Sequence, residues 1–296
     1  MNRTKIITAF YTDLTEFPFF CHTEVARVDR YLHSLRVLNN IGVEIICFCN
    51  DTQYEFLSTH KQNFNLSNVI LKVSNLIDYK NANKMKEIKE STNSFMFYHE
   101  IDWNKIYLLE KEFDESYDYI YWVDVGLSHH GIFPNKYNPN SDLSTGMSHD
   151  YNTYSFTNAF NEKFVYSLNN FIGDKLLNLQ NELMFHSTYE LNRILQGYFN
   201  YDGLSIGGIL GGHTSKLKWF ISEFDTLSQK CLNSNYILNH EAIISFMYEG
   251  NRENFKTFHF QTWYHVDTPN MDDNTKYNLI HFSDFFDTIF EAYENR

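Results

Sequence analysis

The chain has 296 residues, of which 43% are hydrophobic and 21% are charged, and its formal net charge is −13. This composition excludes a disordered chain, and the length suits one α/β domain with a large core. The negative charge and the lack of a basic stripe argue against nucleic acid as the main partner, because a polyanion needs a positive surface.

The N-terminal residues run directly into a strand-like segment, Thr4–Tyr11. They include no long apolar stretch with a cleavage site, and no window of the chain approaches the roughly 18 apolar residues of a membrane span. We therefore expect a cytoplasmic protein without a membrane span. Peripheral association with the inner face of the membrane stays open.

Hydrophobic residues at three- and four-residue spacing predict an amphipathic helix over Thr23–Ile41. The apolar run Val43–Cys49 then predicts a strand that is covered on both faces, as in a parallel sheet. On such a strand Cys47 and Cys49 face the same side, and we expect them to be buried free thiols. Val69–Val73 predicts the next strand.

The basic run Lys80–Lys89, interrupted by glutamates, indicates a solvated helix, and Ile101–Phe113 predicts another helix. Tyr117–Asp124 predicts a fourth strand, which is nearly all aromatic and β-branched until Asp124. The alternation of strands and helices predicts an α/β fold with a central, mostly parallel mixed sheet flanked by helices. Ligands of such sheets bind at the carboxyl ends of the strands.

The second half of the chain is less regular. Its polar stretch Ser128–Thr153 predicts a long ordered loop, and the strand-like segment Leu204–Leu210 leads into Gly211 and Gly212. Helices are predicted at Asn161–Asn169, Asp174–Leu195, Ser215–Leu227 and His240–Tyr248. No repeat, low-complexity tract or linker divides the chain, so we expect a single domain over residues 1–296.

Asp124 is the strongest candidate functional residue. It lies where a hydrophobic strand ends, at the predicted ligand-binding edge of the sheet. A carboxylate there can bind a divalent cation that neutralises the diphosphate of a leaving nucleotide, and Gly126 would let the backbone approach that ligand. An acid that caps a turn would give the same pattern.

Three segments carry a family resemblance: Ile7–Tyr11, Trp122–Leu127 and Gly207–Gly212. In this order they resemble the bacterial HtrL/YibB-like family, which is similar to glycosyltransferases of the GT-A fold. The resemblance implies one GT-A-like domain, with a nucleotide-binding half at 1–127 and an acceptor-binding half with a C-terminal segment at 128–296.

The resemblance also implies a function. It is that of a glycosyltransferase of the hexosyltransferase type, which takes a sugar from a nucleotide-sugar donor linked to uridine diphosphate (UDP). The acceptor would be a hydroxyl of a bacterial surface glycan or of its lipid-linked precursor. Nucleotidyl or phosphoryl transfer on the same sheet, and a non-catalytic glycan- or partner-binding protein, are the alternatives.

In GT-A enzymes an Asp-x-Asp motif holds a metal ion and the sugar nucleotide, whereas this chain has Asp124 followed by Val125 and Gly126. Either Asp124 binds Mn²⁺ or Mg²⁺ with help from elsewhere, or it hydrogen-bonds the ribose or the sugar of the donor directly. His281 resembles the late histidine that completes the metal site of some GT-A enzymes. His259 and His265 compete for that role.

Glu241 is the candidate general base. Asn239 and Glu241 have the pattern of a helix start, which is a sufficient structural role. In GT-A enzymes an acidic or amide residue at a comparable helix start faces the acceptor, where a carboxylate removes a hydroxyl proton. The resemblance implies that Gly207 and Gly208 line the pocket for the donor sugar and the acceptor. A tight turn packed under a helix would explain the same two glycines without a ligand.

The remaining candidates would bind the donor nucleotide. Residues at the end of the first strand would contact the base or the ribose, and two cations would reach a phosphate unless they are solvated or ion-paired. These residues are Thr8, Phe10, Tyr11 and Asp13, and the cations Arg30 and Lys105.

Overall fold

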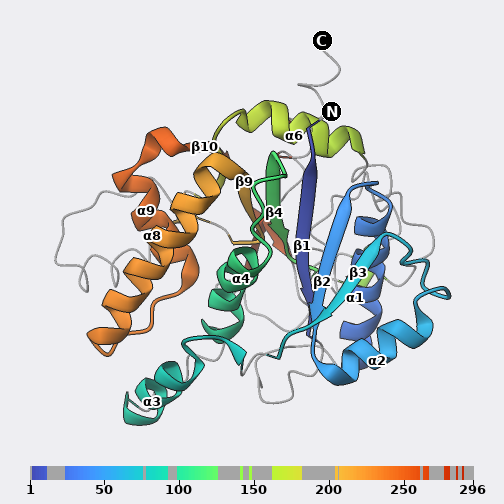
Figure 1. The fold of residues 1–296 in the computed structure, drawn as a ribbon, viewed down its shortest axis with the longest axis horizontal. Helices are drawn as coiled ribbons and strands as arrows, with labels where there is room; N and C mark the ends of the chain where they lie inside the picture. Colours follow the sequence, from blue (N-terminus) through green and yellow to red (C-terminus); the bar gives the residue numbers. More distant parts are fainter. Residues whose placement is uncertain are drawn as a thin grey trace.

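The computed structural model describes residues 2–11, 24–75, 78–92, 99–125, 141–142, 147–148, 162–181, 204–205, 207–260, 263–266, 277–280, 285 and 289. An eight-stranded sheet forms the centre of this part of the chain, with helices on both faces (Figure 1). The predicted α/β fold with a mostly parallel mixed sheet flanked by helices is confirmed.

The sheet has the strand order β10-β7-β9-β4-β1-β2-β3, and β8 pairs with β7 off this path. Its strands are β1 (Thr4–Phe10), β2 (Glu44–Cys49), β3 (Val69–Val73), β4 (Tyr119–Val123), β7 (Leu176–Asn181), β8 (Leu204–Ser205), β9 (Ile209–His213) and β10 (Phe255–Phe260). Two separate hairpin-like pairs are β5 (Ser141–Asp142) with β6 (Met147–Ser148), and β11 (Trp263–Val266) with β12 (Tyr277–Ile280).

The helices divide between the two faces of the sheet. Side chains of α1 (Glu24–Asn39), α2 (Asp51–His60) and α6 (Glu162–Ile172) pack in one core cluster. Side chains of α3 (Ala82–Thr92), α4 (His99–Lys111), α8 (Thr214–Asn233) and α9 (His240–Gly250) pack in the other. A short 3-10 helix, η2 (Arg252–Asn254), links α9 to β10. No described helix is long and apolar enough to cross a bilayer.

Alternate residues of β4 enter the two cores. Tyr121 and Val123 face the α1 side, and Ile120 and Trp122 face the α4 side. Every residue of β4 is buried because both faces of the strand are covered, and this explains its continuous apolar and aromatic sequence. The same alternation places Cys47 and Cys49 in one core as buried free thiols, as predicted.

The path of the chain through the sheet creates a switch point beside β4. From β1 the chain moves outward to β2 and β3, and then returns to form β4 on the other side of β1. These four strands are parallel. In open α/β sheets the connections diverge at such a point, and the crevice outside the carboxyl ends of the strands binds ligands. Here the switch point lies between the carboxyl ends of β1 and β4.

The prediction of a helix over Asp174–Leu195 is wrong for its first part, because Leu176–Asn181 forms β7. Three leucines in this segment fit a helix face as well as a strand. Pairing with β9 on one side and β10 on the other decides the conformation, and no local signal reports that pairing. Strand β10 and helix α2 were also not predicted, although Asn50 and Gln53 form a capping box at the start of α2.

Gly211 and Gly212 lie within β9, whereas the sequence predicted them beyond the end of a strand. Their φ angles are +115° and +146°, in the region that favours glycine. A Cβ atom on Gly211 would overlap the Ile120 carbonyl oxygen, and one on Gly212 would lie 2.5 Å from the Lys175 carbonyl oxygen. These two glycines therefore let β9 fit between β4 and β7.

We expect Gly211→Ala to lower the free energy of unfolding by about 3 kcal/mol, because the new methyl group combines backbone strain with a clash against the β4 backbone. Urea denaturation measures this change. Gly250→Ala is the matched control, since a Cβ atom there meets nothing within 4 Å. Equal losses in the two variants would contradict this account of β9.

Candidate functional site

Asp124 lies at the carboxyl end of β4, where the sequence places it. Its backbone N–H donates a hydrogen bond of 2.8 Å to the Gly208 carbonyl oxygen, which extends the pairing beyond β9. Its side chain points to the α4 side, where the indole Nε1 of Trp122 donates to Oδ1 at 2.5 Å. The Asp124 side chain keeps 29% of its surface exposed. The carboxylate is therefore held by the protein and still reachable from outside.

Lys105, in the middle of α4, is the partner of the other Asp124 oxygen. Its Nζ donates to Asp124 Oδ2 at 3.0 Å and lies 3.8 Å from Asp102 Oδ1, one helical turn earlier. The side chain is only 8% exposed. Burial lowers the pKa of Lys105, but the carboxylates of Asp124 and Asp102 outweigh burial and raise it above its usual value. Lys105 is therefore a buried ammonium ion.

Gly207 connects this ion pair to Glu241. The Gly207 carbonyl oxygen accepts a hydrogen bond from Lys105 Nζ at 3.4 Å, and the Gly207 N–H donates to Glu241 Oε1 at 2.9 Å. A Cβ atom at this position would overlap the buried ring of His240, which would have to move. The backbone of one residue, Gly207, thus contacts both the Lys105 ammonium of α4 and the Glu241 carboxylate of α9.

Helix α9 brings His240 and Glu241 to the site. Asn239 caps the helix, since its side chain accepts from the Glu241 N–H at 2.8 Å, and the predicted capping role is confirmed. The buried His240 ring places Nδ1 3.4 Å from Asp102 Oδ2, in ion-pair range when the ring is protonated. Asp102 therefore lies between Lys105 and His240.

Burial raises the pKa of Glu241 above its usual value, although His240, the Gly207 N–H and Lys105 oppose the shift. Desolvation disfavours the charged carboxylate, and the nearby donor and positive charges recover part of that cost. A carboxylate whose pKa moves toward neutrality is a better proton acceptor near pH 7 than an ordinary glutamate.

The structure thus brings together five of the residues that the sequence singled out: Lys105, Asp124, Gly207, Gly208 and Glu241. Three other candidates, in β1 or directly after it, are buried. Thr8 and Phe10 are 0% exposed, and Phe10 packs in the core on the α1 side. The buried phenol of Tyr11 donates to the Ser74 carbonyl oxygen at 2.6 Å, so its polar group is already bound.

Several candidates lie outside the described residues: Asp13, Gly126, His281 and the side chains of Arg30 and His265. Their roles stay predictions. His259 is described and lies in β10, at the sheet edge, with β7 and β9 between it and β4. Within the described part of the chain, no group of three or more histidine, cysteine, aspartate or glutamate side chains is arranged to hold a metal ion.

Asp102, Trp122 and His240 are parts of the site to which the sequence analysis gave no role. Asp102 is one turn before Lys105, and His240 precedes Glu241, so both were adjacent to residues already singled out. Spacing along α4 could have paired Asp102 with Lys105. Nothing local indicates that α4 and α9 approach each other.

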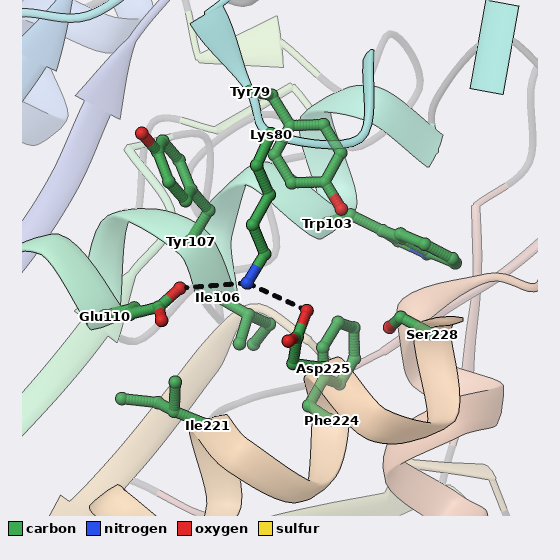
Figure 2. Close-up of a pocket in the computed structure, with 10 residues that line it drawn as sticks. All are labelled: Tyr79, Lys80, Trp103, Ile106, Tyr107, Glu110, Ile221, Phe224, Asp225 and Ser228. Carbon is green, nitrogen blue, oxygen red and sulfur yellow. Dashed lines mark hydrogen bonds and ion pairs between the residues drawn. The ribbon is translucent and has the colours of Figure 1, made fainter. Parts of the chain in front are cut away.

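A shallow hollow lies on the same side of the sheet, between α4 and α8 (Figure 2). Lys80 lies across it and pairs with Glu110 at 3.3 Å and Asp225 at 2.8 Å. Trp103 lines it and donates from Nε1 to the Leu238 carbonyl oxygen at 2.8 Å, which ties α4 to the segment before α9. Asp124 does not line this hollow, so the hollow is separate from the candidate site.

No family model matches the chain, and a comparison with curated protein sequences finds no match either. Solved structures with a similar course of the chain are a mouse xyloside xylosyltransferase 1, a glucose-1-phosphate thymidylyltransferase described as putative from Bacillus anthracis and a 4-diphosphocytidyl-2C-methyl-D-erythritol synthase from Anaerococcus prevotii.

The mouse protein is 9% identical, with a TM-score of 0.46, over 86% of this chain and 85% of its own. The Bacillus protein is 10% identical, with a TM-score of 0.40, over 90% of each chain. The Anaerococcus protein is 10% identical, with a TM-score of 0.40, over 100% of this chain and 97% of its own. These similarities are too distant to indicate a function, so a function has to be inferred from the geometry of the site.

A double-mutant cycle tests whether Lys105 and Asp124 stabilise each other. We expect Lys105→Met and Asp124→Asn to show a coupling energy of about 2 kcal/mol in urea denaturation, because each removes the nearest charged partner of a largely buried charge. Lys218→Met with Glu115→Gln is the control cycle. That pair has the same separation, 3.0 Å, but is 72% and 70% exposed, so its coupling should be close to zero.

Proposed function

We propose that this protein is a glycosyltransferase that binds a nucleotide-linked sugar beside Asp124 and transfers the sugar to a hydroxyl group. One observation carries the proposal. Asp124 and Glu241, far apart in sequence, are joined through Lys105 and the Gly207 backbone at one end of the sheet. Two carboxylates in different environments can take different roles in one reaction.

The position of this group in the fold supports a ligand site. Asp124 follows β4 at the switch point of the sheet, where open α/β sheets bind nucleotides and related ligands. Because β9 is antiparallel to β4, Gly207 and Gly208 precede β9 at this same edge. The edge therefore carries a partly exposed carboxylate and a glycine backbone side by side.

The two carboxylates suit separate halves of the reaction. Asp124 is oriented by Trp122 and Lys105, and we assign it to the donor. Glu241 has a raised pKa, and we assign it to the acceptor as the general base that removes the hydroxyl proton during attack on the sugar. The Gly207 N–H keeps the Glu241 carboxylate in place for that step.

A divalent cation does not fit at Asp124 among the described residues. Trp122 donates to one of its oxygens, and the Lys105 ammonium, 3.0 Å from the other, already supplies a positive charge there. Two unit charges 4 Å apart interact by about 4 kcal/mol near a protein surface, and a divalent ion doubles the repulsion from an ammonium. The alternative in which Asp124 hydrogen-bonds the donor directly agrees better with this geometry.

Donor and acceptor are the more specific parts of the proposal. The UDP-linked sugar, the hexosyltransferase type and the acceptor on a bacterial surface glycan or its lipid-linked precursor follow from the resemblance of the sequence to the HtrL/YibB-like family. A peripheral protein at the cytoplasmic face of the membrane would meet such an acceptor.

Titration calorimetry with a panel of nucleotide sugars tests the donor site. We expect one UDP-sugar to bind, and Asp124→Asn to weaken its binding at least about tenfold by removing a charged hydrogen-bond acceptor. Glu115→Gln, at an exposed residue of the same charge, should bind normally.

The products distinguish the alternatives. Release of UDP supports glycosyl transfer, whereas pyrophosphate release would indicate a nucleotidyltransferase. Binding without any turnover would indicate a non-catalytic binding protein. Normal donor binding by Asp124→Asn would remove Asp124 from the site.

For Glu241→Gln we expect kcat to fall about 10²- to 10³-fold with little change in the KM for the donor, because the general base is lost. In the unchanged protein the rate should fall as the pH decreases through the raised pKa of Glu241, since only the deprotonated carboxylate accepts a proton. This acid limb should disappear in Glu241→Gln. Glu253→Gln, at an exposed position, is the control. Equal rates in both variants would restrict Glu241 to its structural role.

A further inference from the structure

Lys105 Nζ lies at the centre of a set of oxygen atoms from three separate segments. Asp124 Oδ2 after β4 is 3.0 Å away, the Gly207 carbonyl oxygen before β9 is 3.4 Å away, and Asp102 Oδ1 on α4 is 3.8 Å away. Carboxylate and carbonyl oxygens that converge from different segments are also the ligands that Mg²⁺ and Mn²⁺ take in proteins. Here the centre of the set is filled by an ammonium group of the chain itself.

The ammonium group cannot easily leave this position. The Lys105 side chain is 8% exposed, so moving it aside would require space in the packed surroundings of α4. Moving it would also leave Asp102, which is 17% exposed, with one fewer cationic neighbour. The cation of this site is therefore built into the fold and does not exchange with solvent.

We infer that the Lys105 ammonium takes the place of a divalent cation in this site, and that Asp124 binds the donor through one of its hydroxyl groups without a metal ion. The part that concerns the donor rests on the proposed function, whereas the part that concerns the cation does not. Lys105 acts as a positioning residue, because it holds Asp124 and balances its charge.

A hydroxyl group is the donor feature that matches this carboxylate. Each carboxylate oxygen can accept two hydrogen bonds, so Trp122 and Lys105 leave acceptor capacity on both Asp124 oxygens. The exposed 29% of the side chain is where a further partner can reach them. A neutral hydroxyl of the ribose or the sugar can donate to the carboxylate, whereas a phosphate group would be repelled by it.

Manganese binding, followed through the electron paramagnetic resonance signal of free Mn²⁺, tests the cation without any nucleotide. The unchanged protein and Asp124→Asn should bind the same amount of Mn²⁺. A tightly bound ion that is lost in Asp124→Asn would overturn the inference. This comparison does not depend on any change at the buried Lys105.

A second variant tests whether the ammonium fills the place of an ion. Lys105→Ser removes the positive charge and leaves the oxygen set in place, so its Mn²⁺ affinity should exceed that of the unchanged protein by at least about tenfold. Lys218→Ser, at an exposed ion-paired lysine, is the control and should gain nothing. A folded Lys105→Ser protein with no added manganese binding would contradict the inference.

Donor binding in the presence of a chelator completes the test. The UDP-sugar that binds the unchanged protein should bind with the same affinity in excess EDTA, and loss of binding in EDTA would overturn the inference. If no nucleotide sugar binds with or without Mn²⁺, the proposed function fails. The manganese comparisons then still decide whether Lys105 replaces an ion.

Discussion

The site depends on one buried charge, the ammonium of Lys105. A largely buried cation is stable only when anions and hydrogen-bond acceptors surround it, and here Asp124, Asp102 and the Gly207 carbonyl oxygen do so. This requirement holds α4, the end of β4 and the start of β9 in one arrangement. It also orients Asp124 before any ligand arrives, and such preorganisation reduces the cost of binding.

The reversed direction of β9 links the fold to the site. In a fully parallel sheet the strand beside β4 would end at the edge where Asp124 lies. Because β9 is antiparallel, it begins there, and Gly207 and Gly208 meet Asp124 and Glu241. Gly211 and Gly212 permit this insertion, since side chains at these positions would meet the backbones on either side.

Sequence patterns predicted the first half of the sheet well, because β1, β2, β3 and β4 are short runs rich in β-branched, aromatic and other apolar residues. They were less successful at β7, where leucines and amides suit a helix as well as a strand. For the site, the end of an apolar strand indicated Asp124, and the pattern of a helix start indicated Glu241. Both residues occupy the expected local positions.

The sequence by itself thus determined the local elements and the residues at their ends, because spacing and end signals act within a few residues. Only the tertiary structure decided which of these residues meet. It paired Lys105 with Asp124 and joined both to Glu241 through Gly207, and it placed Asp102 and His240 in the same group. Ion pairs between distant segments form where the strand order brings the charges together, and that order has no local signature.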